Sequence, residues 1–192
     1  MAMITIRNER STDIAARERL LDAALGPARA AKSSERLREG RLPAEGLSLI
    51  AEDDNCVVGT VRLWHVVAGP ARPALLLGPL TVDGAWRGRG IGAALMRRAG
   101  SAAQELGHSA ILLVGDAPYY ARFGYSAAKT GSLWMPGPYE RDRLLGAELV
   151  AGALDGARGL ISATGRAAPR PALATLIAAI LHNEIVSAQH AA

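Results

Sequence analysis

Cysteine is almost absent from this chain of 192 residues, because Cys56 is its only one. A single cysteine excludes an internal disulfide framework and is typical of a reducing compartment. The first residues lack the apolar core of an export signal, and no uninterrupted apolar run approaches the roughly 20 residues that span a bilayer. We therefore expect a cytoplasmic protein with no membrane partner.

Aromatic residues are also scarce, at 4% of the chain, whereas 49% of the residues are hydrophobic. The core is therefore expected to be aliphatic, and the length fits one domain better than two. We predict a single domain over residues 1–165 and a helical extension over residues 166–192. Apolar residues recur at helical spacing from 171 to 187, so this helix would need a surface, either on its own domain or in a homodimer.

A strong net charge is missing too, since the formal value is only +4. Residues 86–104 nevertheless contain four arginines and no acidic residue, and residues 29–41 contain five basic residues against two acidic ones. Such local excesses favour a small anionic ligand over nucleic acid, although the 29–41 segment could equally be a solvated basic face. No His, Cys or carboxylate cluster has metal-ligand spacing, so no metal is expected.

Hydrophobic periodicity and turn residues predict alternating strands and helices. The expected elements are a strand at 4–7, a helix at 11–25 capped by Ser11 or Thr12, hairpin strands at 47–52 and 56–67, a strand at 74–83, a helix from 91 to about 106, a strand at 109–114, a short helix at 117–125 and a strand at 146–154. The first helix would turn Ile14, Leu21 and Leu25 to one side. A loop is expected between the short helix and the last strand.

Two features of the strand at 74–83 bear on function. Gly78 and Pro79 interrupt it, and because proline cannot donate to a ladder, they predict a bulge or a split in the sheet. A right-handed crossover helix follows the strand, so the strand at 109–114 is expected to run parallel to it.

Glycines cluster where this crossover helix begins. Gly88, Gly90 and Gly92 allow close approach of the backbone to a ligand, while Arg87 and Arg89 add positive charge. The first amides of a helix lack intrahelical acceptors and lie at the positive end of the helix dipole. The turn therefore predicts a site for a pyrophosphate.

Two classes of nucleotide-binding turn fit these residues. Residues 88–93 satisfy G-x-G-x-x-A, the fingerprint of dinucleotide-binding enzymes, and Asp116 ends the following strand. Five residues separate Val82 from Gly88, however, and antiparallel strands precede the unit. An NAD(P)-dependent oxidoreductase is therefore the less favoured of the two classes.

The second class has the pattern R-x-x-G-x-G, which Arg87, Gly90 and Gly92 satisfy. With this pattern the chain resembles the GNAT superfamily of N-acetyltransferases, and the resemblance extends to LGPLTVDGAWRGRGIGAALM and GDAPYYARFGY. The stretch YYARFGYSAA is similar to a branch of predicted acetyltransferases whose substrates are largely unassigned. The resemblance covers roughly residues 4–161 and implies direct transfer of an acetyl group from acetyl-CoA to an amine, in a ternary complex.

The resemblance also implies a fold and a set of site residues. The fold is α/β (α+β), with a mixed, mostly antiparallel sheet that is splayed between its central parallel strands and has helices on both faces. Tyr120 is implied to protonate the departing thiolate, whereas Tyr119 is expected chiefly to pack in the core. The implied cofactor-binding residues are Leu80, Thr81 and Val82 for pantetheine, Arg87, Gly88, Arg89, Gly90, Ile91 and Gly92 for the pyrophosphate, and Ala93 at the helix start.

No residue stands out as the general base. Asp83, Glu148 and His65 are each expected to be structural, and Cys56 has no visible histidine partner that would make it a nucleophile. A non-catalytic CoA-binding module is the alternative, and Tyr120 favours the enzyme because a binder needs no acid. The acceptor is expected to contact residues 29–41 and 133–143, and a small amine, a peptide N-terminus and a protein lysine all remain open.

Overall fold

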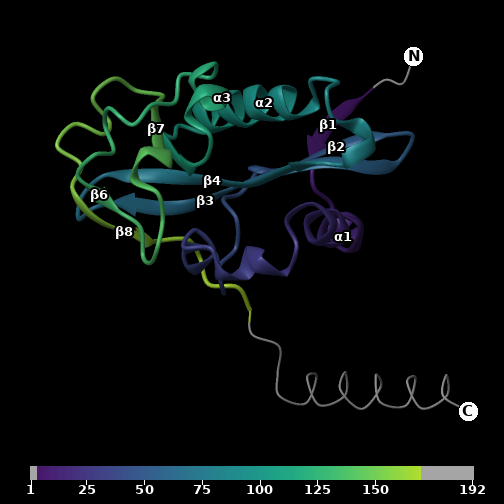
Figure 1. Ribbon diagram of the computed structural model, residues 1–192, viewed down its shortest axis with the longest axis horizontal. Coiled ribbons are helices and arrows are strands. Elements are labelled where there is room, and N and C mark those ends of the chain that lie inside the picture. Colours follow the sequence, from purple (N-terminus) through teal and green to yellow (C-terminus); the bar gives the residue numbers. More distant parts are fainter. Residues whose placement is uncertain (1–3, 170–192) are drawn as a thin grey trace, which may run out of the picture.

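The structure is a computed structural model that describes residues 4–169. Its sheet has the strand order β1-β2-β3-β4-β5-β7, with β6 and β8 joined at one end, and its two longer helices lie on opposite faces (Figure 1). The helix predicted at 171–187, with its role in a homodimer, lies outside the described residues. No helix within residues 4–169 is long and apolar enough to cross a membrane.

The elements alternate as the sequence pattern predicts, with short 3-10 turns between them. The strands are β1 Thr5–Asn8, β2 Ser48–Asp53, β3 Cys56–Ala68, β4 Pro73–Val82, β5 Ala110–Val114, β6 Leu133–Trp134, β7 Leu144–Glu148 and β8 Gly159–Ala163. The helices are α1 Ile14–Leu25, α2 Ile91–Glu105 and α3 Ala117–Ala121. The 3-10 turns are η1 Ser11–Asp13, η2 Pro27–Ala31, η3 Glu35–Leu37, η4 Gly84–Trp86 and η5 Arg141–Arg143.

The core is aliphatic, as the composition predicts. On the α2 side of the sheet, Leu95, Ala99 and Ala103 of the helix are fully buried against strand residues such as Leu49 and Leu63. The hairpin between β2 and β3 turns at Asp54 and Asn55, whose φ angles are 43° and 63°. The tightness of this turn fixes the register of β2 with β3 where the two strands meet at the hairpin.

The predicted interruption of the strand at 74–83, which is β4, is confirmed. Val61 of β3 pairs with Leu80 of β4, and Leu63 pairs with Leu77. Between these two pairs β3 has one residue, Arg62, whereas β4 has two, Gly78 and Pro79, so β4 forms a bulge. The buried indole of Trp64 donates a hydrogen bond of 2.6 Å to the Gly78 carbonyl, which holds the bulge in place.

The bulge coincides with a split in the sheet. Strands β4 and β5 are parallel and pair only through Leu75 with Ile111 and Leu76 with Leu112. Strand β5 remains paired along its whole length with β7. Beyond Leu76, the edge of β4 that faces β5 therefore has no strand partner among the described residues. The predicted splayed sheet with helices on both faces is confirmed.

Several element boundaries differ from the sequence-based expectation, and the short helix expected at 117–125 already ends at Ala121. The strand expected at 146–154 is β7, which begins at Leu144 and ends at Glu148. The following residues form a turn because the Glu148 carboxylate accepts hydrogen bonds from the amides of Gly152, at 3.3 Å, and Leu154, at 2.8 Å. The loop expected before this strand contains β6 and η5.

The first helix also begins later than predicted. It starts at Ile14, after the turn η1, rather than being capped by Ser11 or Thr12. The carboxylate of Asp13 accepts a hydrogen bond from the Arg10 amide at 2.7 Å and so closes the turn before the helix. As a result Ile14 is 47% exposed instead of lying on the buried side.

Candidate functional site

The glycine turn brings unpaired amides to the start of α2. Gly88 and Gly90 have φ angles of 78° and 77°, in the left-handed region that favours glycine. The amide of Ala94 makes a backbone hydrogen bond of 2.9 Å to the Gly90 carbonyl. The amides of residues 91–93 precede this bond and have no acceptor within the helix. They leave free donors at the helix terminus, which is the geometry that the sequence predicts for an anion site.

A cavity of about 400 Å³ lies against this turn, and we call it the turn cavity. Two exposed arginines, Arg87 and Arg122, contribute positive charge to its wall. The guanidinium of Arg122 lies 4.5 Å from the centre of the Tyr119 ring. Arg89 does not line this cavity and instead stacks on the Trp86 ring at 4.5 Å. The lining residues are Val82, Trp86, Arg87, Gly88, Gly90, Ile91, Gly92, Ala93, Tyr119 and Arg122.

A second cavity, of about 300 Å³, continues from the first along β4, and we call it the middle cavity. The two cavities share Val82, Arg87, Gly92 and Tyr119. A Cβ atom on Gly92 would lie 3.2 Å from the Tyr119 hydroxyl oxygen, so the absence of a side chain keeps this passage open. The middle cavity is lined by Ala24, Leu25, Leu80, Thr81, Val82, Arg87, Gly92, Tyr119 and Tyr120.

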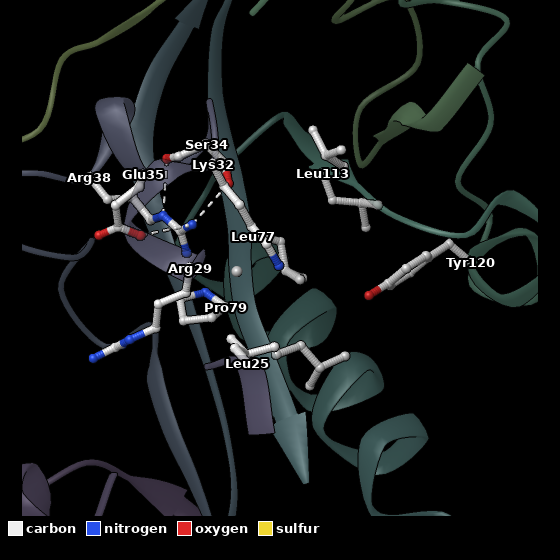
Figure 2. A pocket seen from close by; sticks show the side chains of 13 residues that line it. Leu25, Arg29, Lys32, Ser34, Glu35, Arg38, Leu77, Pro79, Leu113 and Tyr120 are labelled. Carbon is white, nitrogen blue, oxygen red and sulfur yellow. Dashed lines mark hydrogen bonds and ion pairs between the residues drawn. The ribbon is translucent and has the colours of Figure 1, made fainter. Parts of the chain in front are cut away.

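The third cavity, of about 130 Å³, lies where β4 and β5 part, and we call it the inner cavity. It shares Leu25, Leu80 and Tyr120 with the middle cavity. Figure 2 shows an apolar side formed by leucines and the Tyr120 ring, facing a polar side formed by residues of the 29–38 segment. The three cavities therefore follow one another from the glycine turn, past the unpaired edge of β4, to the split in the sheet.

Tyr120 stands between the middle and inner cavities. Burial raises the pKa of its hydroxyl above the ordinary value, and the neighbouring Tyr119 raises it further. Figure 2 shows the hydroxyl pointing into the inner cavity. The Tyr119 ring meets the Tyr120 ring edge-on, with the ring centres 5.0 Å apart. Tyr119 thus packs as expected, but it also lines two of the cavities.

Gly115 holds the Tyr120 ring in place, and the sequence patterns did not reveal it. A Cβ atom on this residue would lie 2.7 Å from Cδ2 of Tyr120, closer than side-chain atoms pack. The ring therefore rests directly on the backbone at the end of β5. The only available sequence signal is a glycine immediately after a buried strand, five residues before the tyrosine.

Comparisons with known proteins identify this arrangement. A family model described as the acetyltransferase (GNAT) domain matches residues 44–127. YhbS of Escherichia coli K12, an N-acetyltransferase described as uncharacterized, is 32% identical over 117 residues, which are 60% of this chain and 70% of YhbS. This chain belongs to the GNAT acetyltransferase family. Membership decides between the two classes of glycine turn, in favour of R-x-x-G-x-G.

Two crystal structures of GNAT proteins resemble this GNAT chain. The structure of Escherichia coli YhbS in complex with CoA superposes with a TM-score of 0.72 at 30% identity, covering 85% of this chain and 91% of that one. A GNAT acetyltransferase of Brucella melitensis in complex with acetyl-CoA has a TM-score of 0.56 at 31% identity, covering 65% of this chain and 84% of that one. The enzyme class predicted from the sequence, a GNAT N-acetyltransferase, is confirmed.

The three residues weighed as possible bases, and Cys56, which was weighed as a nucleophile, all lie outside the cavities of the GNAT chain. The Asp83 carboxylate accepts a hydrogen bond of 2.9 Å from the Ala85 amide and caps the turn η4. Glu148 caps the turn after β7. The His65 ring lies 5.3 Å from the ring of His108, centre to centre. Cys56 is exposed at the start of β3. None of the four lines any of the three cavities.

Other residues line the cavities although the sequence assigned none of them a role in the donor site. Arg122 faces the turn cavity, and Leu25, at the end of α1, separates the middle and inner cavities. Basic residues of the 29–41 segment, which the sequence left open as a solvated face, line the inner cavity. Among the described residues, no group of three or more His, Cys, Asp or Glu side chains could hold a metal ion.

Proposed function

We propose that this GNAT acetyltransferase moves an acetyl group from acetyl-CoA directly to an amine, with both substrates bound together. The observation that carries the proposal is the succession of cavities from the glycine turn to the split in the sheet. Such a passage suits a long donor that is charged at one end and reactive at the other. It leaves the inner cavity for the acceptor.

The chemistry of the passage fits acetyl-CoA. The free amides of residues 91–93, with Arg87 and Arg122, would hold the pyrophosphate by hydrogen bonds and charge. The unpaired edge of β4 at residues 80–82 would bond pantetheine as an added strand does. The complexes of the two crystallised relatives with CoA and acetyl-CoA support acetyl-CoA as the donor.

The reaction needs a nucleophile, a place for the developing negative charge and a proton for the leaving sulfur. The neutral amine attacks the thioester carbonyl carbon, so that a C–N bond forms and the C–S bond breaks. Backbone amides near residues 80–82 would stabilise the oxygen that becomes negative. The sulfur leaves as a thiolate and takes a proton from the Tyr120 hydroxyl. The acetylated nitrogen then loses its surplus proton to solvent, and solvent returns a proton to the Tyr120 oxygen.

The inner cavity offers little for removing a proton from the amine. Glu35 is the only carboxylate among its lining residues, and it lies 3.1 Å from the guanidinium of Arg38 in an ion pair. A paired carboxylate is a weak base. We therefore expect the amine to lose its proton to solvent, and the rate of transfer to rise as the pH approaches the amine pKa, which is about 10.4 for an alkyl ammonium.

Calorimetry and product analysis test the proposal together. Acetyl-CoA should bind and NADH should not, and one member of an amine panel (amino acids, polyamines, peptides with free N-termini and lysine side chains) should release CoA and gain an acetyl group. Chromatography should follow CoA, because a thiol reagent would also react with the exposed Cys56. Binding of acetyl-CoA without CoA release from any amine would identify a non-catalytic binding module instead.

A further inference from the structure

Arg38 provides a buried positive charge beside the inner cavity. The residue is only 7% exposed, and burial lowers the pKa of its guanidinium below the usual value. Nε donates to the Ser34 carbonyl at 3.0 Å, and Nη2 donates to Ser34 Oγ at 2.9 Å and pairs with Glu35 at 3.1 Å. Nη1 is enclosed by the chain and has no hydrogen-bond partner among the described residues. A buried N–H without an acceptor costs free energy of folding, and a ligand that accepts a hydrogen bond from it would recover that cost.

The free donor, Nη1 of Arg38, lies at the split in the sheet. Nη1 lies 3.7 Å from the point where a Cβ atom on Gly78 would stand. Gly78 is part of the β4 bulge and lines the inner cavity together with Arg38. The unsatisfied part of the guanidinium therefore faces the point at which β4 leaves β5.

Lys32 adds a second, accessible charge to the same cavity. Figure 2 shows its side chain extending over Leu77 with the ammonium group toward the cavity. No carboxylate within residues 4–169 lies within ion-pair distance of this ammonium.

The remaining charges around the cavity are already paired. Arg29 lies 2.6 Å from Glu18 and 2.9 Å from Asp22, and Glu35 is paired with Arg38. The charge of Lys32 is therefore left without a partner next to the free N–H of Arg38. Together they make the polar side of the inner cavity a receptor for one small anionic group.

We propose that the acceptor amine also carries a carboxylate, which binds Lys32 and Arg38 at the inner cavity. This inference rests on the proposed acetyl transfer. A carboxylate presents two oxygens, one for the Lys32 ammonium and one for Nη1 of Arg38. Because Nη1 is enclosed, this second bond requires a small shift of the short turns η2 and η3 when the acceptor binds. Tyr120 lies on the opposite side of the cavity (Figure 2), so the amino group of a small amino acid would lie toward the hydroxyl that serves the thioester.

The test compares acceptors with a carboxylate against acceptors in which that carboxylate is replaced by an amide. Each L-amino acid is assayed against its own carboxamide at saturating acetyl-CoA. Putrescine, O-phosphoethanolamine and a short peptide that is amidated at its C-terminus and lacks Asp and Glu are assayed beside them, and CoA and the acetylated product are quantified by chromatography. The carboxylate form of at least one pair should have a kcat/KM at least 10-fold above that of its amide. Equal or better use of the amides, or a preference for O-phosphoethanolamine, would overturn the proposal.

Variants of Lys32 and Arg38 test whether these two residues cause the preference for the carboxylate form of the acceptor. Lys32→Met, at an exposed position, should raise KM for the carboxylate form about 10-fold while leaving the amide and the Kd of acetyl-CoA unchanged. Arg38→Gln should act in the same direction, with its melting temperature measured to check folding. Arg36→Met is the matched control, because Arg36 belongs to the same segment but its guanidinium lies against Gly137, outside the three cavities.

The outcomes separate this inference from the function on which it rests. If putrescine or the amidated peptide is acetylated and no amino acid is, acetyl transfer stands and the carboxylate proposal falls. If no amine is acetylated although acetyl-CoA binds, both fall. An unchanged preference for the carboxylate in Lys32→Met and in a folded Arg38→Gln would also overturn the assignment of these residues.

Discussion

At the scale of single residues, Tyr120 combines a ring packed on two sides with a hydroxyl that faces a cavity. Its ring rests on the backbone of Gly115 and meets the Tyr119 ring edge-on, while its hydroxyl faces a cavity. Burial raises its pKa above the ordinary value near 10. The hydroxyl therefore keeps its proton at neutral pH, which a proton donor to a thiolate requires.

Replacing Tyr120 by Phe should lower kcat about 100-fold, within the range for loss of a general acid. The Kd of acetyl-CoA should change less than about twofold, because the ring and its packing remain. Stopped assays for kcat and calorimetry for Kd measure the two effects. Tyr139→Phe is the control, since its hydroxyl donates to the Leu133 carbonyl at 3.0 Å, away from the cavities. Full activity in Tyr120→Phe would remove this residue from the mechanism.

The pH dependence of the wild type follows from the same pKa. Because the pKa of Tyr120 is raised, its hydroxyl is protonated throughout the neutral and mildly alkaline range. The value of kcat/KM should rise with pH as the acceptor ammonium loses its proton, with no descending limb below about pH 10. A pH profile measured with a primary amine tests this. A decline between pH 8 and 9 would contradict the role of a tyrosine with a raised pKa.

At the scale of elements, the site depends on how α2 begins and on how β4 leaves β5. The left-handed conformation of Gly90 starts the helix with its free amides facing the turn cavity. The β4 bulge at Gly78 and Pro79 lies at the point where the sheet opens. Neither element supplies a reactive side chain here, and both act through the direction of their backbone.

A substitution at the start of α2 distinguishes an effect on acetyl-CoA binding from an effect on the stability of the fold. Gly90→Val places a branched residue at φ 77°, where a side chain is strained by about 1–2 kcal/mol, and it should raise the Kd of acetyl-CoA at least 10-fold. Gly107→Val is the matched control, because Gly107 has φ 79° but follows the far end of the same helix. Both variants should lose similar stability, and only the first should lose affinity. Equal affinities in calorimetry would mean that the turn does not hold the donor.

At the scale of the whole molecule, the proposed donor site joins elements that are far apart in the chain. The middle cavity is formed by the end of α1, the unpaired edge of β4, the start of α2 and the rings of α3. In Figure 1, α1 lies on the face of the sheet opposite α2 and α3. A ligand in this passage touches both layers, so its binding is linked to the folding of the entire domain.

Acetyl-CoA should therefore raise the melting temperature. A ligand at 100 times its Kd adds about 2.7 kcal/mol to the free energy of unfolding. For a chain of this size each kcal/mol corresponds to about 2–4 °C, so a shift of roughly 5–11 °C is expected. Differential scanning fluorimetry measures the shift, with NADH at the same concentration as the control. A similar shift with NADH would contradict specific recognition of CoA.

The sequence by itself determined the local parts of this protein and its family. The hairpin turn within residues 53–55, the break at Pro79 and the glycine turn before α2 were all predictable, because each depends on backbone preferences within a few residues. The predicted end of β7 was wrong, because the Glu148 carboxylate ends the strand by bonding to amides of the residues that follow.

Only the tertiary structure decided what surrounds the reacting groups. Lys32 and Arg38 belong to a segment without periodicity or motif, and their place beside Gly78 and opposite Tyr120 follows from how that segment packs across the split sheet. The contact of the Tyr120 ring with the Gly115 backbone likewise follows from how the chain packs in the folded protein. Local patterns report the conformation of the backbone, whereas the composition of a cavity depends on which distant segments pack together, and that is a property of the folded core alone.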